Sequence, residues 1–121
     1  MYKVTDSEIE DIIETAGYGM NYWAVRGVVD SEARTYTVTT DPDLIDDEEP
    51  ATLSYDYLLE VAFSISEGQY EVSENIRSYF IDWRDALKAD DEESQWAGGS
   101  IDSDAGDVLV QIAIHGEIVY G

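Results

Sequence analysis

Apolar residues recur at intervals of three and four in four stretches of the chain, which is the spacing that places them on one face of an α-helix. We expect helices within residues 5–19, 55–68, 74–89 and 103–116. The β-branched residues of 108–114 leave a strand as the alternative in the last stretch. Residues able to cap a helix N-terminus stand at each start: Thr5, Asp6 or Ser7, then Ser54, Ser73 and Asp102.

Residues 20–40 follow a different pattern, in which apolar positions alternate with polar or small ones. The apolar members are Trp23, Val25, Tyr36 and Val38. The segment DSEA supplies a turn between the two halves, so the pattern predicts a β-hairpin. Together with the helical stretches it predicts an α+β fold of about four helices and a small antiparallel sheet, in a single compact domain over residues 1–121.

Charge changes this picture more than any motif does. The chain has 28 acidic and 6 basic residues, a net charge of −22, and the acids are densest in segments 41–50 and 90–93. A hydrophobic fraction of 44% with 12% aromatic residues still indicates a folded domain and not a disordered acidic tail. Carboxylates repel phosphates, which disfavours direct binding to nucleic acid and excludes an anionic membrane surface as a partner.

The sequence offers little for catalysis. His115 is the single histidine and no G-x-S-x-G motif accompanies it, so a helix-end or packing role is favoured over a catalytic one. The segment DSDAGD (102–107) departs from EF-hand spacing, and its first acids are better explained as the start of a helix. We therefore expect no enzymatic activity, no cofactor and no metal site.

Two stretches resemble a known group of proteins. TAGYGMNYWA (15–24) and IDSDAGDVLVQIAIHGEIVYG (101–121) are similar to segments of small uncharacterised acidic proteins encoded by actinobacterial bacteriophages. That group has a glycine–Tyr–Trp motif near the N-terminus and a GE(V/I)VYG C-terminus; here Tyr18 separates glycines that are more often adjacent in the group. The resemblance covers about 30 residues. It implies a phage accessory protein and carries no catalytic residue over.

The expected location follows from what the chain lacks. No cysteine is present, which excludes disulfides and thiolate chemistry. The first twelve residues contain no apolar signal core, and no apolar run approaches the roughly 18 residues of a transmembrane helix. We expect a soluble cytoplasmic protein, working in the host cell cytoplasm if it is encoded by a phage.

The acidity suggests mimicry of DNA. Duplex DNA carries one charge per roughly 1.7 Å of axis, so 22 net charges match about 37 Å of duplex. A folded chain of this length is roughly 35 Å across. We therefore expect an inhibitor of a basic host nucleic-acid-binding protein, in anti-restriction, anti-CRISPR or a similar role. The alternative is a halophilic or generally acidic protein-interaction domain without mimicry, which the low lysine content also fits.

Mimicry would need the acidic patches to share one face. A third patch is predicted on the first helix, where Glu8, Asp11 and Glu14 follow one flank. Trp96, in the second acidic loop, is a candidate aromatic anchor for the partner. The candidate partner-binding residues are Asp41, Asp43, Asp46, Asp47, Glu48, Glu49, Asp90, Asp91, Glu92, Glu93 and Trp96.

Overall fold

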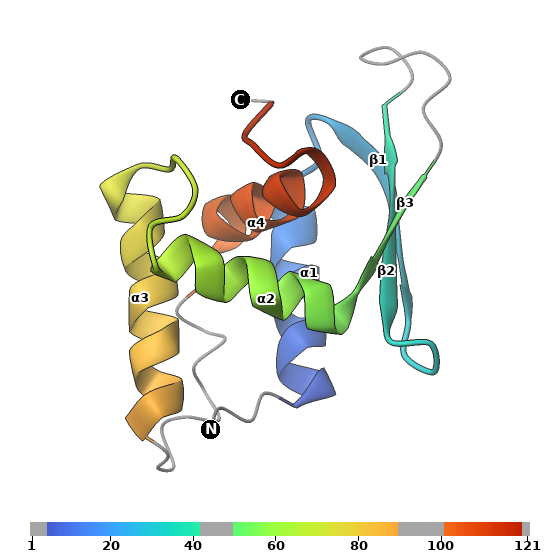
Figure 1. Cartoon of the computed structure of the whole chain (residues 1–121). Coiled ribbons are helices and arrows are strands. Elements are labelled where there is room, and N and C mark those ends of the chain that lie inside the picture. Colours follow the sequence, from blue (N-terminus) through green and yellow to red (C-terminus); the bar gives the residue numbers. More distant parts are fainter. Residues whose placement is uncertain (1–4, 42–49, 90–100, 120–121) are drawn as a thin grey trace.

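The computed structural model describes residues 5–41, 50–89 and 101–119. In this part of the chain, four helices lie to one side of a three-stranded antiparallel sheet of order β1-β2-β3 (Figure 1). The α+β class predicted from the sequence is therefore confirmed. The elements are α1 (Asp6–Gly19), β1 (Ala24–Asp30), β2 (Thr35–Thr40), β3 (Ala51–Ser54), α2 (Tyr55–Ser66), α3 (Glu74–Ala89) and α4 (Ser103–His115).

Side-chain caps set where the helices begin. Thr5 Oγ1 accepts a hydrogen bond from the Glu8 N–H, and Asp102 Oδ1 accepts one from the Ala105 N–H. Ser54 and Ser73 cap α2 and α3 in the same way, so the predicted caps are confirmed. Residues 108–114 lie within α4, and the strand alternative for them is wrong.

The sheet contains one strand that the sequence did not predict. β3 has only four residues and pairs with β2 from Thr35↔Ser54 to Val38↔Ala51. β2 alternates as expected, with Tyr36 and Val38 buried against the helices. Val25 lies in β1, as the hairpin prediction requires, but it is 57% exposed, because it falls at a register shift between Ala24 and Arg26.

The core lies between the helices and the inner face of the sheet. α1 and α4 cross closely: a Cβ on Gly106 would lie 2.8 Å from both Cα and Cβ of Ala16, and one on Gly19 would overlap the Ser103 carbonyl oxygen. Glycine is therefore needed at both positions for this helix pair to approach so closely. On the other side of the core, the rings of Phe63 and Trp83 stack obliquely with centroids 4.7 Å apart.

None of the helices in the described part of the chain combines the length and the apolar character required to cross a membrane.

Candidate functional site

A buried polar cluster joins the start of the hairpin to α4. The turn after α1 presents Tyr22 and Trp23 to Asp107, which α4 places in its second turn. The Trp23 Nε1–H donates to Asp107 Oδ1 over 2.6 Å, and the Tyr22 hydroxyl donates to Oδ2 over 2.6 Å. Gln111, one helical turn further along, adds a donor to Oδ1 at 3.0 Å. The carboxylate is thus bonded at both oxygens while only 7% exposed.

These contacts hold the phenol of Tyr22 in its protonated form. Its pKa is raised to about 12, first because burial disfavours the phenolate and next because the hydroxyl donates to the Asp107 carboxylate. A tyrosine so perturbed does not serve as a general base near neutral pH. The cluster therefore forms a structural junction between the start of the hairpin and α4.

The same cluster connects the two stretches for which the sequence suggested a resemblance to phage proteins, 15–24 and 101–121. Tyr22 and Trp23 belong to the first stretch, and Asp107 and Gln111 to the second. The Val119 N–H donates to Gln111 Oε1 over 2.9 Å, which ties the segment after α4 to it as well. Gly19 and Trp23 of the first stretch therefore pack against Ser103 and Asp107 of the second. Sequence reasoning missed Asp107 and Gln111, although two polar residues four apart in an apolar helix indicate such a cluster.

Most arginines in the described residues make contacts with other parts of the protein. Arg34 bridges two helix N-termini: its Nε lies 3.1 Å from Asp6 of α1, and its Nη2 lies 3.1 Å from Asp56 of α2. The guanidinium also lies 5.6 Å from the centre of the Tyr55 ring. Arg77 and Arg84 each donate to the Ser66 carbonyl oxygen at the end of α2.

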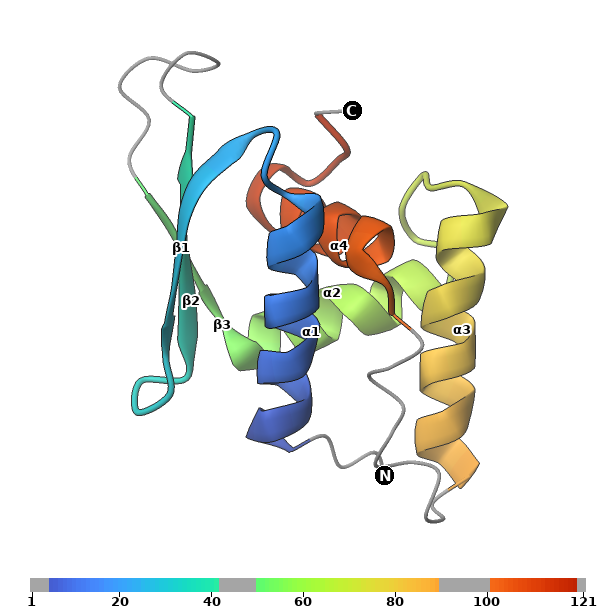
Figure 2. The ribbon, with the colours of Figure 1, turned by 180° about the vertical axis from the view of Figure 1, so that it is seen from behind.

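An open groove runs between α1 and β1, which lie side by side in Figure 2. Its volume is about 390 Å³, within the range of ligand-binding clefts. It is lined by Glu10, Ile13, Glu14, Gly17, Gly27, Val29 and Tyr36. Glu10 accepts hydrogen bonds from the hydroxyls of Tyr55 and Ser31, and Glu14 is exposed. No basic side chain is among these described lining residues, so the groove favours a cation.

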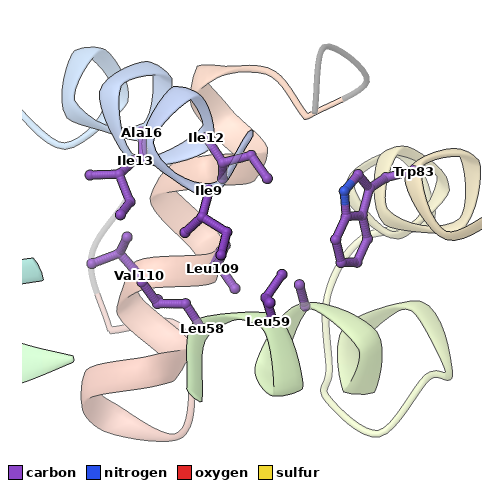
Figure 3. A pocket seen from close by; sticks show the side chains of 10 residues that line it. Ile9, Ile12, Ile13, Ala16, Leu58, Leu59, Trp83, Leu109 and Val110 are labelled. Atoms are coloured by element: carbon purple, nitrogen blue, oxygen red, sulfur yellow. The ribbon is translucent and has the colours of Figure 1, made fainter. Parts of the chain in front are cut away.

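A second cavity lies inside the helical layer and has a different character. Figure 3 shows Ile9 and Ile12 of α1, Leu109 of α4 and Trp83 of α3 around it. The cavity measures about 10 Å³, barely the space of one water molecule, and its walls are apolar. Within the described residues the buried indole N–H of Trp83 meets no acceptor. This cavity is a packing gap between apolar side chains of the core.

The predicted partner-binding residues are only partly covered by the structure. Asp41 is half-buried at the end of the hairpin, and its N–H donates to the Trp23 carbonyl over 2.8 Å. The remaining ten lie outside the described residues: Asp43, Asp46, Asp47, Glu48, Glu49, Asp90, Asp91, Glu92, Glu93 and Trp96.

The acidic flank predicted on α1 is smaller than expected. Asp11 and Glu14 are exposed, but Glu8 is half-buried, and burial raises the pKa of its carboxyl. His115 is the last residue of α4, as predicted. Among the described residues, no group of three or more possible ligands is placed to hold a metal ion.

Exposed carboxylates in the described residues occur on every helix and on the hairpin turn. Examples are Asp11, Glu14, Glu32, Glu60, Glu74, Asp82 and Asp104. They are therefore not gathered on a single helix, and the negative potential extends over several elements.

These features define a small acidic α+β protein with an open acidic groove and an Asp–Trp–Tyr junction, in which Asp107 and Trp23 are buried and Tyr22 is 50% exposed. No family model matches the chain, and no curated protein or solved structure is significantly similar to it.

Proposed function

We propose that the protein binds a positively charged nucleic-acid-binding protein and blocks the site at which that protein holds DNA. The observation that supports this most is the excess of carboxylates that the fold leaves unneutralised. The net charge is −22, and Arg34, Arg77 and Arg84 are turned to contacts within the protein. Such a surface attracts a basic partner rapidly and in a salt-dependent way.

The kind of partner follows from charge density and from the resemblance to phage proteins. Carboxylates held on a folded frame offer oxygen acceptors to the arginines and lysines that otherwise contact phosphates. A phage accessory protein with this chemistry would act against a host defence or transcription protein. The role is inhibition by binding, without a catalytic step.

A competition experiment tests the proposal. The protein is immobilised, a host lysate is applied at low salt, and bound proteins are eluted first with duplex DNA and then with rising salt. The proposal predicts a protein that duplex DNA releases. A variant with Asp46→Asn, Asp47→Asn, Glu48→Gln and Glu49→Gln should capture less of it. The control loses the same charge at exposed positions, by substitution of Gln for Glu60, Glu67, Glu71 and Glu74. It should still capture the partner. The proposal is contradicted if duplex DNA releases no captured protein and the first variant captures as much as the wild type.

A second candidate function is an acidic interaction domain adapted to high salt. It is favoured by the spread of exposed carboxylates over all the described helices, together with only two lysines in the chain. In this alternative, concentrated salt is required to screen the self-repulsion of the folded state. Thermal unfolding at low ionic strength distinguishes the two. A cooperative transition there supports the inhibitor, and a chain that folds only near molar salt supports the adapted domain.

A further inference from the structure

We propose that the edge of β1 and the groove beside it receive an extended segment of the partner, in which cationic residues alternate with apolar ones. This inference deepens the proposed function, because it assigns a docking surface to the basic partner. It rests on a strand edge that no described strand pairs with, on an apolar and acidic groove next to that edge, and on the charge of the chain.

Among the residues that the structure describes, the outer edge of β1 is open to pairing. Within the described residues β1 pairs with β2 alone, so every second backbone N–H and C=O of β1 points away from the sheet. Natural edge strands are commonly protected by charges, prolines or covering segments. Here Val28 and Val29 are each 42% exposed, and regular pairing continues from Arg26 to Asp30. Such an edge accepts an added strand through main-chain hydrogen bonds.

The register of β1 decides which side chains the added strand would meet. Gly27 and Val29 pair with Val38 and Tyr36 and share the inner face. This is the face that lines the groove opposite Glu10 and Glu14. Val28 pairs with Thr37 and lies on the outer face, together with Arg26. Alternate side chains of an added strand would therefore enter the acidic groove, and the others would pack beside Val28.

Charge selects the occupant. A lysine or arginine entering the groove can lay its aliphatic stem along Ile13 and Tyr36 and place its charge beside Glu14. Arg26 disfavours a second cation on the outer face, which leaves that face to apolar residues. Pairing of β1 with β1 of another copy would bring together two chains of net charge −22, so a cationic segment is the better occupant.

Two synthetic peptides of identical composition test the inference with the intact protein. One alternates valine and lysine over six residues, and the other carries three valines followed by three lysines. Both have the same charge, but only the first places every lysine on one face of a strand. We expect the alternating peptide to bind at least tenfold more tightly at physiological salt. At saturation, the edge-facing amides of residues 26–30 should exchange with solvent at least tenfold more slowly.

A pair of protein variants tests the groove. Glu14→Gln should weaken the alternating peptide about two- to fivefold, as expected for one exposed ion pair. The matched control Glu60→Gln removes the same charge from an exposed position on α2 and should leave affinity within about twofold of the wild type.

Three results would overturn the inference. The peptides could bind equally, the amides of 26–30 could remain unprotected, or sedimentation could reveal a dimer that protects those amides without any peptide. Equal binding of the two peptides would leave the proposed function standing as general electrostatic attraction. Failure of duplex DNA to displace the captured partner would contradict the proposed function without bearing on the edge of β1.

Discussion

Trp23 donates its indole N–H to the carboxylate of Asp107 across 2.6 Å, although 84 residues separate the two along the chain. The bond is buried, and it fastens the start of the hairpin to α4 at the place where α1 and α4 cross. This pair therefore contributes to the orientation of the sheet relative to the helices, and with it to the groove between α1 and β1.

Removal of the Asp107 carboxylate should destabilise the protein strongly. In Asp107→Ala, the indole of Trp23 and the amide of Gln111 lose a buried acceptor, so we expect the free energy of unfolding to fall by about 3 kcal/mol. The control Asp82→Ala removes the same charge from an exposed helical position and should change it by less than about 0.5 kcal/mol. Urea unfolding of both variants measures the difference. Equal midpoints would show that the cluster is not structural.

The protonation of Tyr22 should make stability fall at high pH. Its folded-state pKa is raised from 10.0 to about 12, so the folded protein holds this proton more tightly than the unfolded chain does. The resulting stabilisation is fully present below pH 10 and is lost as the pH rises through the interval from 10 to about 12. Denaturant unfolding at pH 8 and pH 11 measures the loss.

Comparison with Tyr22→Phe isolates this contribution, because the pKa values of Tyr36 and Tyr55 are also raised by burial. The variant should lose less stability between the two pH values than the wild type does. Identical pH dependence would mean that the Tyr22 hydroxyl is not held by Asp107.

Two glycines of similar helical setting should respond to alanine in opposite ways. At Gly106 a methyl group would approach the backbone of Ala16 within 2.8 Å, so Gly106→Ala should destabilise by about 1–3 kcal/mol despite its gain in helix propensity. At Gly17 no atom lies within 4 Å of the new methyl group, so Gly17→Ala should stabilise by about 0.5–1 kcal/mol. Thermal or urea unfolding checks both. Stabilisation by Gly106→Ala would contradict the close crossing of α1 and α4.

The bridge formed by Arg34 should depend on salt. Arg34→Gln breaks its contacts to Asp6 and Asp56 and should lower the midpoint of thermal unfolding. The control Arg26→Gln removes the same charge from the exposed edge strand. At low salt, we expect Arg34→Gln to lower the midpoint of thermal unfolding more than the control does. At 0.5 M salt the difference between the two midpoints should be smaller, because screening weakens exposed ion pairs. Equal losses at low salt would mean that the bridge contributes nothing.

The helices could be predicted from the sequence because their signals are local. Apolar spacing and caps such as Thr5 and Asp102 lie within a few residues of the structure that they specify. β3 could not be predicted in this way, since a strand of four residues is defined by its pairing with β2 and has almost no periodicity of its own.

The candidate site was harder to predict for a related reason. An acidic residue indicates exposure to solvent. The sequence does not show on which face of the folded protein the residue will lie. The groove exists because Glu10 and Glu14 of α1 happen to lie across from Gly27 of β1, a relation set by the fold and not by any motif. The residue that contacts Asp107 could not be predicted either, because it lies far away along the chain.

Competition between this protein and duplex DNA for one partner tests the central claim most directly. A basic protein captured from the host lysate is mixed with fluorescently labelled duplex DNA, and the anisotropy of the DNA is followed as the acidic protein is added. The account predicts that the DNA is released in proportion to the added protein, and that added salt weakens both complexes. A ternary complex, in which the DNA stays bound while the acidic protein also binds, would contradict it.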